Sequence, residues 1–478
     1  MARIVILGAG VAGLAAAYRL KQLRPADEVT IVEQADKPGG LARSWKNREF
    51  AADLGPHRIY TELPEIEALL PELIARDQML TVSRRSELYL HGHYFNYPVR
   101  AFELLKVLGP IKMSALAFSA IAGKLRGLAR KAANYEEAME AAFGRGVYRM
   151  IVQPYTRKVW KIEPERLSEE VARVRVSAGN AAKLIKQLLG KFEGKKGSQS
   201  ALSSFSYIRG GVEGLVTSLM EKVTRAGTEV VTQCRVSGLN CDHGALTGIQ
   251  VEGGGTTRTI HADYVISTVP VTDLVSMLQP CSENAVAARA AGELVYIGLI
   301  LVAVVVKRAQ FTPNSWIYFP EEKFVFNRSY EPRNFDPSMA PADKTIAVFE
   351  VTARWDSELW QQADAEVIRQ VRSDVLKTGL LTEQDIDDMF VLRVPHTYPL
   401  YTIEFRQQLE EIFQYLRGFA NLITTGRQGL FNHNNMDHSM LMGIKAAECL
   451  DDAIKAGRPA AANWYDSLGQ FSHFRIVD

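Results

Sequence analysis

The feature that most constrains this chain is a glycine-rich turn between a strand and a helix at its N-terminus. Residues 3–7, RIVIL, predict a buried strand, and the turn Gly8-Ala9-Gly10-Val11-Ala12-Gly13 follows at once. The next residues, LAAAYRLKQL, predict a helix, and EVTIVE predicts a second strand that ends at Glu33. The pattern predicts a right-handed βαβ unit, which places the fold in the α/β class.

The spacing inside this unit is the one that binding of a dinucleotide requires. Gly8 would make the tight turn, Gly10 would let the backbone approach a pyrophosphate, and Gly13 would let the helix pack closely on the strand. The helix N-terminus, at Val11 and Ala12, offers free N–H groups and a positive dipole to phosphates. Glu33 would accept hydrogen bonds from the adenosine ribose.

A second glycine pair favours FAD over NAD. The segment Pro38-Gly39-Gly40-Leu41-Ala42-Arg43-Ser44 follows Glu33, and simple NAD sites do not need it. An extended FAD does, because this backbone and Arg43 can contact its pyrophosphate and ribityl chain from the other side. An ordinary turn would give the same residues. Gly55-Pro56-His57 then brings a rigid backbone near the same place.

The C-terminal region contains a third motif of this kind. Asn434, Asn435 and Asp437 are strong N-cap residues ahead of an amphipathic helix. Such a helix N-terminus would stabilise negative charge on the pyrimidine edge of a reduced flavin. A capped surface helix is the alternative, but Gly426-Arg427 lies only eight residues upstream and supports the flavin site.

Together these motifs resemble the flavin amine oxidase and protoporphyrinogen oxidase superfamily, which includes UDP-galactopyranose mutase. The resemblance extends over nearly the whole chain and includes a Tyr-x-x-Lys-x-Trp pattern at Tyr155, Lys158 and Trp160. It implies FAD as the cofactor, held without a covalent bond because Cys449 lies too far along the C-terminal helix to attach it. The cofactor-binding residues predicted are Gly8, Gly10, Val11, Ala12, Gly13, Glu33, Gly39, Gly40, Leu41, Ala42, Arg43, Gly55, Pro56, His57, Val236, Gly426, Arg427, Asn435 and Met436.

The resemblance also implies a substrate pocket lined from a second domain. Arg328 and Glu331 resemble an Arg-x-x-Glu pattern of the mutase branch, in which the arginine meets a diphosphate. The catalytic residues predicted are His57, Arg328, Tyr398 and Arg427, although a surface ion pair or a core aromatic would explain each one equally well. His91 and His93 suggest a metal pair without an evident third ligand, so no metal site is predicted.

A chain of 478 residues exceeds what one hydrophobic core usually organises. We predict a discontinuous Rossmann-like FAD-binding domain of the glutathione-reductase type from residues 1–84, 205–289 and 416–478. An inserted α+β substrate domain would comprise 85–204 and 290–415, with a mainly helical segment at 101–190. The apolar, β-branched run at 294–306 and the segment 344–353 predict strands, and 363–378 predicts a helix.

The partners expected are a small-molecule or lipidic substrate and no nucleic acid. The four cysteines form no C-x-x-C pair, and the N-terminus predicts a strand rather than a signal peptide, so we expect a cytoplasmic protein. The segment 101–134 carries six basic residues and one acid around the run MSALAFSAIA. Such a helix can lie in a membrane interface, which would make the protein peripheral. The alternative, which the sequence favours slightly, is a helix pair packed on the second domain.

The function expected is that of an FAD-dependent oxidoreductase that takes a hydride from a substrate C–H bond onto flavin N5. One alternative is a non-redox mutase in which reduced flavin attacks a nucleotide sugar. A second is an FAD-binding protein without catalysis. The sequence leaves the electron acceptor and the oligomeric state open.

Overall fold

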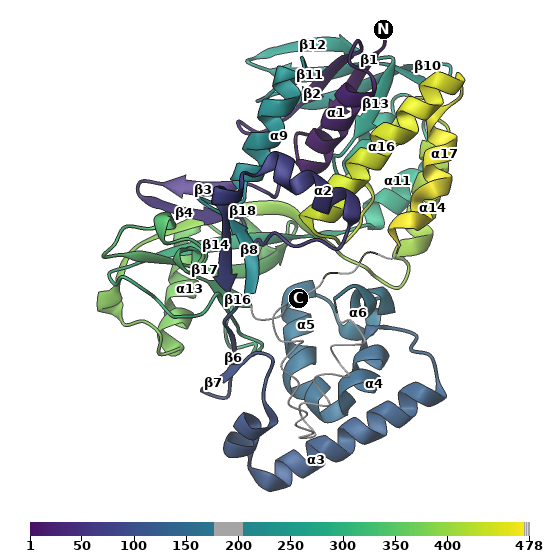
Figure 1. The fold of residues 1–478 in the computed structure, drawn as a ribbon. Coiled ribbons are helices and arrows are strands. Elements are labelled where there is room, and N and C mark those ends of the chain that lie inside the picture. Colours follow the sequence, from purple (N-terminus) through teal and green to yellow (C-terminus); the bar gives the residue numbers. More distant parts are fainter. Residues whose placement is uncertain (176–203, 473, 475, 477–478) are drawn as a thin grey trace.

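A five-stranded parallel sheet forms the centre of one half of the molecule (Figure 1). The computed structural model describes the chain except for residues 176–203, 473, 475 and 477–478. The strand order is β19-β13-β1-β2-β9, with β1 at Arg3–Leu7 in the middle. The others are β2 (Glu28–Val32), β9 (Glu229–Val231), β13 (Tyr264–Ser267) and β19 (Leu422–Thr424). All three segments predicted for the FAD-binding domain therefore contribute strands, and the predicted Rossmann-like α/β architecture is confirmed.

Two helices, one from the N-terminal part of the chain and one from the C-terminal part, pack closely against each other beside this sheet. They are α1 (Val11–Leu23) and α16 (Met436–Ala456). A Cβ built at Gly443 of α16 would lie 2.1 Å from the carbonyl oxygen of Ala12, so the crossing requires glycine there. The crossing places the C-terminal motif beside the N-terminal glycine turn.

Two segments in the middle of the chain, residues 229–239 and 259–270, each form two strands that lie in different sheets. Residues 229–239 form β9 and then β10 (Arg235–Asp242), separated by Gln233 with a left-handed φ of 54°. Residues 259–270 form the end of β12 (Thr256–His261) and then β13, which lie in different sheets. The Asp263 N–H donates to the carbonyl of Arg3, which turns the chain back to the central sheet. With β11 (Ala245–Gly253), β10 and β12 make a three-stranded antiparallel sheet.

A seven-stranded sheet forms the core of the other half. Its order is β18-β14-β17-β16-β15-β6-β7. The predicted apolar strand is β14 (Tyr296–Val306), buried at every residue because side chains pack on both of its faces. The remaining strands are β6 (Ser86–Leu90), β7 (His93–Asn96), β15 (Trp316–Tyr318), β16 (Arg328–Tyr330), β17 (Thr345–Arg354) and β18 (Ile386–Pro399), and the predicted helix is α13 (Asp364–Lys377). These strands come from 85–204 and 290–415, whereas α14 (Phe405–Leu416) packs on α11 (Ala285–Glu293) in the other half.

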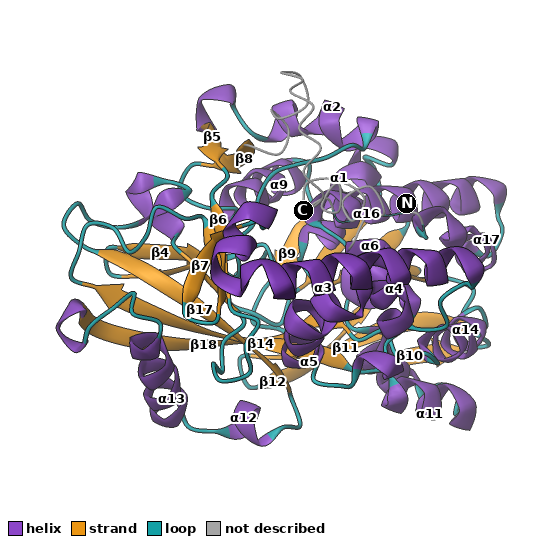
Figure 2. Ribbon diagram, turned by 90° about the horizontal axis from the view of Figure 1, so that it is seen from below, coloured by secondary structure: helices purple, strands orange, loops and turns teal. Residues whose placement is uncertain are grey.

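A helical lobe completes the molecule (Figures 1 and 2). It contains α3 (Ala101–Ala129), α4 (Tyr135–Val147), the π-helical turn η2 (Tyr148–Val152), α5 (Gln153–Trp160) and α6 (Glu169–Arg175). The predicted helical segment continues to 190, and its last part lies outside the described residues. The other elements are β3 (Ser44–Asn47), β4 (Phe50–Asp53), β5 (Met79–Ser83), β8 (Ser204–Ile208), α2 (Pro64–Leu73), α9 (Glu213–Arg225), α10 (Val271–Leu278), α12 (Glu358–Gln361), α15 (Gly426–Gly429) and α17 (Ala460–Ser467).

Candidate active site

A cavity of about 980 Å³ lies where the two halves and the helical lobe meet. This volume is at the upper end of the range of about 300–1,000 Å³ that is usual for ligand pockets. Except for Gly13, every residue predicted to bind the cofactor lines the cavity, and so do the four residues predicted to be catalytic. The cavity also extends between β6, α4, η2 and α5, where the sequence predicted only that a second domain would contribute.

Each of the three glycines of the N-terminal turn is a glycine for a different physical reason. Gly8 has a φ of 98°, and a Cβ there would lie 2.5 Å from Thr268 Oγ1. A Cβ at Gly13 would lie 2.1 Å from the carbonyl oxygen of Gly8, so Gly13 serves the close helix packing that the sequence predicted. Gly13 does not line the cavity, and its contact with the cofactor stays a prediction. Gly10 has an ordinary φ of −70°. The nearest described atom to a Cβ there is Gly40 Cα at 4.0 Å, so the fold itself does not require this glycine.

Glu33 is fixed at the carboxyl end of β2, facing the cavity. Its two carboxylate oxygens accept hydrogen bonds from the backbone N–H groups of Ala9 (2.9 Å) and Ala35 (2.8 Å). Each carboxylate oxygen can accept a further bond. Glu33 is thus held in place by the turn and can also accept from a ligand hydroxyl group.

The second glycine pair is attached directly to the first turn. The Gly39 N–H donates to the carbonyl of Ala9 at 2.8 Å, and Gly39 and Gly40 both have positive φ. Arg43 Nε donates to the carbonyl of Gly40 at 3.0 Å, and Arg43 lies at the cavity wall. The two loops, the N-terminus of α1 and one guanidinium therefore make a positively polarised wall suited to a pyrophosphate.

The C-terminal motif presents a second helix N-terminus to the same cavity. Asn435 is the N-cap of α16, and its N–H donates to His438 Nδ1 at 3.2 Å in a reciprocal capping box. Asn435, Met436 and Ser439 line the cavity. Since α16 has 21 residues, its first turn contributes free N–H groups and a positive dipole there.

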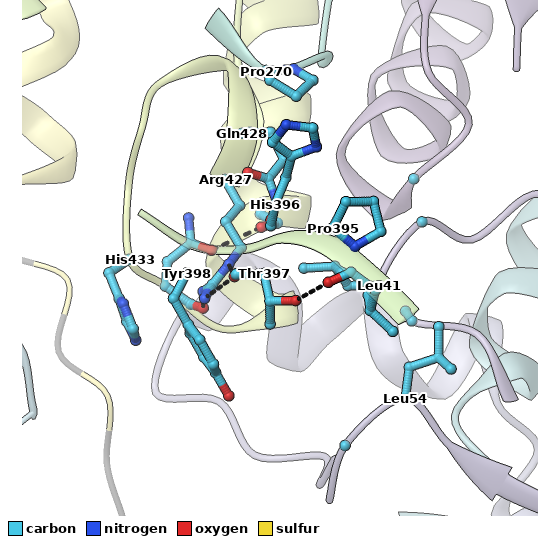
Figure 3. Close-up of a pocket in the computed structure, with 18 of the residues that line it drawn as sticks. Leu41, Leu54, Pro270, Pro395, His396, Thr397, Tyr398, Arg427, Gln428 and His433 are labelled. Carbon is cyan, nitrogen blue, oxygen red and sulfur yellow. Dashed lines mark hydrogen bonds between the residues drawn. The ribbon is translucent and has the colours of Figure 1, made fainter. Parts of the chain in front are cut away.

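A bulge in β18 forms the wall next to this helix (Figure 3). Between the pairs Ile297–Tyr398 and Leu299–Val394, three residues of β18 (395–397) face one residue of β14. His396 at its centre has a left-handed φ of 52°, which is strained for a residue with a side chain. The carbonyls of His396 and Thr397 accept hydrogen bonds from Gln428 and Arg427, so α15 holds the bulge in shape.

Arg427 is a positioning residue in this arrangement. Its Nε and Nη2 donate to the Thr397 carbonyl at 3.0 and 2.8 Å, and Nη1 donates to the Asn434 carbonyl. The guanidinium also lies 5.5 Å from the centre of the Tyr398 ring. Arg427 therefore joins the bulge to the residues that precede α16. Sequence reasoning missed the bulge because its register depends on the partner strand.

Aromatic side chains line the other end of the cavity. Tyr398 and His433 stack with ring centroids 5.5 Å apart, and Trp160 lies 5.7 Å from His433. Tyr155 packs edge-on against Tyr318 at 5.9 Å. The cavity lining here also includes Leu88, Tyr97, Tyr135, Met139, Phe143, Ile151, Val152 and Val159.

Lys158, the central residue of the Tyr-x-x-Lys-x-Trp pattern, does not line the cavity. Its ammonium is buried and donates to the carbonyls of Phe319 (2.7 Å), Phe326 (3.2 Å) and Glu321. It ties α5 to the loop between β15 and β16. Lys158 thereby holds Tyr155 and Trp160, on the same short helix, against the cavity.

Arg328 lines the cavity with its charge already paired. Its Nε and Nη2 donate to the two carboxylate oxygens of Glu350 at 2.8 and 2.9 Å, and Glu350 is 1% exposed. Glu331 does not join it: that carboxylate is buried and accepts from the N–H groups of Phe311 and Thr312. The Arg-x-x-Glu pattern therefore does not form one site.

His57 lies where the two ends of the cavity meet. Burial lowers the pKa of its imidazole to about 4, and the positive charges of Arg328 and Arg427 act in the same direction. The ring is therefore neutral near pH 7. Its Nδ1 is buried and has no hydrogen-bond partner among the described residues, which leaves it available to a ligand.

No group of three or more His, Cys, Asp and Glu side chains among the described residues is arranged to hold a metal ion. His91 lies in the turn between β6 and β7, and both it and His93 are exposed.

The residues at the first end of the cavity, where the glycine turns and the helix N-termini lie, fit FAD. Gly10 leaves space that the fold does not need, two helix N-termini and Arg43 face the cavity, and Glu33 has accepting capacity left. In addition, the polar atom His57 Nδ1 is buried and open to a ligand.

Comparison with known proteins identifies relatives of this chain. Residues 11–431 match the model of the family described as flavin containing amine oxidoreductase. Coproporphyrinogen III oxidase of Staphylococcus aureus is 26% identical over 34% of this chain, and protoporphyrinogen oxidase 2 of Arabidopsis thaliana is 24% identical over 58%. The matches span 38% and 58% of the length of these two relatives.

Solved structures share the fold at low sequence identity. A reduced UDP-galactopyranose mutase superposes with a TM-score of 0.79 at 21% identity, covering 100% of this chain and 98% of that one. A redesigned putrescine oxidase superposes with a TM-score of 0.60 at 14% identity, covering 94% and 98%. The family match confirms the superfamily resemblance and FAD as the cofactor, and the solved structures confirm the fold.

Proposed function

We propose that this chain, which belongs to the flavin containing amine oxidoreductase family, oxidises a C–H bond of a small apolar or lipidic molecule. The family and the oxidases among its relatives support an FAD-dependent oxidoreductase. We add to this the type of bond that is oxidised and the class of substrate. Both are supported by the end of the cavity that aromatic and apolar side chains line, which we call its second end.

When bound, FAD would supply a two-electron acceptor for a hydride from the substrate carbon. The chain supplies the setting for this chemistry. The N-terminus of α16 would stabilise negative charge on a group held beside Asn435 and Met436. Arg427 keeps the bulge and the residues before α16 in fixed relation. Trp160, Tyr398 and His433 form a continuous aromatic wall.

The apolar lining of the second end is the observation that carries the proposal. Met139 and Phe143 of α4, Ile151 of η2 and Tyr155 of α5 face the same space as Tyr318 of β15. Aromatic and aliphatic walls of this kind take up apolar molecules, with a few polar groups to orient them. Neutral His57 is one such group, because its imidazole can hold a hydrogen bond to a substrate without adding a charge.

The mutase is the rival, and its fold is shared over the full length of the chain. A nucleotide sugar carries a diphosphate, which needs a fixed cation with donors to spare. Two of the donors of Arg328 are engaged by Glu350, which also cancels its charge. This pairing favours the oxidoreductase. A non-catalytic FAD-binding protein would not need the extended apolar cavity beyond the cofactor.

The proposal is tested by adding substrate classes to the oxidised holoprotein without oxygen. We expect an apolar substrate to bleach the oxidised flavin stoichiometrically. Met139→Arg, which places a charge in the apolar end, should prevent this bleaching while the protein keeps its FAD. Phe413→Arg, on α14, offers a control that does not touch the cavity.

The second arm of the test uses dithionite-reduced protein and UDP-sugars. We expect that no isomerised sugar forms. If isomerised sugar does form, and a change at Arg328 that leaves the protein folded abolishes it, the mutase replaces the oxidoreductase. Protein that holds FAD but shows neither activity across the screened classes would indicate a binding protein.

A further inference from the structure

The longest helix of the lobe, α3, carries an apolar face that the rest of the described chain does not cover. After a break at Gly109, where φ is 74° and ψ is 168°, the helix continues to Ala129. Five large apolar side chains on it are between 52% and 84% exposed: Ile111, Phe118, Ile121, Leu125 and Leu128. Their spacing of seven, three, four and three residues places them on one side of the helix.

The other side of α3 is packed closely on α4, so the apolar face is held outward. A Cβ at Gly123 would lie 2.4 Å from the Glu140 carbonyl oxygen, and one at Gly127 would lie 2.9 Å from Ala141 Cβ. These small residues let the two backbones approach. The outward face is therefore a fixed feature of the lobe. Single exposed apolar residues are ordinary on a protein surface, but a continuous stripe of this length marks an interaction surface.

Basic residues flank the stripe. Lys112, Lys124 and Arg126 on the helix and Arg130 and Lys131 just after it are exposed. Arg126 lies 3.6 Å from Glu140, and Lys131 lies 3.9 Å from Glu169, so part of this charge is balanced within the lobe. A helix with an apolar stripe and basic flanks matches the boundary of a bilayer, where acyl chains lie beneath anionic headgroups.

We propose that α3 docks the protein on an anionic phospholipid membrane, lying in the headgroup region with its apolar stripe toward the acyl chains. A second copy of the chain fits less well, because pairing two such faces would bring basic flanks together. By length and composition alone, residues 102–128 could span a bilayer, with a mean hydropathy of 1.5 in the most apolar window. The break at Gly109 and the packing of α3 along α4, which carries Glu136 and Glu140, support the interfacial position instead.

This docking places the membrane near the apolar end of the cavity. One side of α4 packs on α3, and Tyr135, Met139 and Phe143 from the same helix line the cavity. The helix α4 thus lies between the docking face and the substrate end. Membrane docking does not depend on the proposed reaction, and it would hold for any substrate that this cavity takes.

The experiment is co-sedimentation of the full-length holoprotein with vesicles of phosphatidylcholine, with or without phosphatidylglycerol. We expect binding to the vesicles that contain phosphatidylglycerol, and weaker binding at high salt. Phe118→Asp together with Leu125→Asp should lower the affinity about tenfold or more, since both side chains leave the acyl region. Lys112→Glu together with Lys124→Glu should lower it on anionic vesicles only.

The matched control is Trp355→Asp, which removes a large side chain of similar exposure (57%) beyond the far end of β17. We expect this variant to bind vesicles like the wild type, and all variants to retain FAD. Wild-type protein that sediments with neither vesicle would overturn the proposal. Self-association that Phe118→Asp abolishes would assign the apolar face to a second copy of the chain. Protein that leaves the vesicles only when detergent is added would indicate a membrane-spanning helix.

Discussion

The two ends of the cavity are built on different principles. At the cofactor end, glycine turns and helix N-termini bring backbone to the wall: the turns at Gly10 and at Gly39-Gly40, and the N-termini of α1 and α16. At the substrate end the wall is side chains, from strands and helices that lie far apart in the sequence. A backbone wall needs local residues in a fixed order. A side-chain wall needs only that distant elements meet with the right volume and polarity.

The contacts of each glycine separate those that the fold requires from the one that a ligand requires. Gly8 and Gly13 are required by neighbouring atoms of the chain, whereas a Cβ at Gly10 meets Gly40 Cα only at ordinary contact distance. Gly10 is therefore the position at which the cofactor end can be broken without breaking the fold.

The largest effect that we predict is loss of FAD in Gly10→Val. The added side chain would occupy the space that the pyrophosphate needs, while the φ of −70° and ψ of 173° at this position suit any residue. We expect the purified variant to be colourless and to take up no FAD. The thermal midpoint of the variant should match that of wild-type apoprotein.

Gly13→Ala is the matched control. Its Cβ would lie 2.1 Å from a backbone oxygen, so we expect the apoprotein itself to lose stability. If Gly10→Val kept FAD, or if it unfolded the apoprotein as Gly13→Ala should, then the distinction between the two glycines would be wrong.

The same difference explains how much the sequence could predict. The residues that line the cofactor end could be named from the sequence because each motif is a local turn whose geometry follows from its own residues, such as Gly39 and Gly40. Gly13 does not line the cavity, and the close packing of α1 on the turn is the role that the sequence also predicted for it.

The substrate end could not be predicted in the same way. Met139, Phe143 and Ile151 have the pattern of any helical core, and only the placement of the lobe turns them toward the cavity. The bulge at His396 depends on pairing with β14, and the partner of Arg328 is 22 residues away on a neighbouring strand. Long-range pairing of this kind leaves no local signal.

Our second prediction tests whether Arg328 belongs to the fold of the substrate end or to its ligand. Arg328→Ala leaves the Glu350 carboxylate buried without its bidentate partner. Removing one member of such a pair costs about 3–5 kcal/mol, less where water can reach the site. We expect a large loss of unfolding free energy in denaturant titrations of the apoprotein.

The double variant Arg328→Met with Glu350→Gln removes both charges together. We expect it to regain a substantial part of the lost stability, because no uncompensated charge stays buried. A fully stable Arg328→Ala protein would instead show that the ion pair contributes little to the fold. Arg328 would then be available to meet an anionic substrate.

Our third prediction concerns His57, at the junction of the two ends, and has the smallest expected effect. The pKa of its imidazole is about 4 in the folded protein, against an ordinary value of 6.5. Between these values the unfolded chain takes up a proton that the folded chain does not. Stability from this group is therefore complete above about pH 6.5 and is lost as the pH falls toward 4, by at most about 3 kcal/mol.

Asp53, four residues earlier, changes the stability with pH in the opposite direction. Burial raises the pKa of its carboxyl to about 6, so its contribution is complete below about pH 3.8 and is lost as the pH rises toward 6. The pH-dependent contributions of the two groups to stability partly cancel in the wild-type protein.

The Asp53 contribution is the same in wild type and in His57→Gln. Subtracting the unfolding free energy of the variant from that of wild type therefore leaves the contribution of the imidazole. We expect unfolding free energies of the two apoproteins, measured from about pH 7 to about pH 4, to show wild type losing stability relative to the variant throughout that range. Parallel curves would mean that His57 titrates normally and is reached by water. The junction between the two ends would then be open to solvent rather than closed around a neutral imidazole.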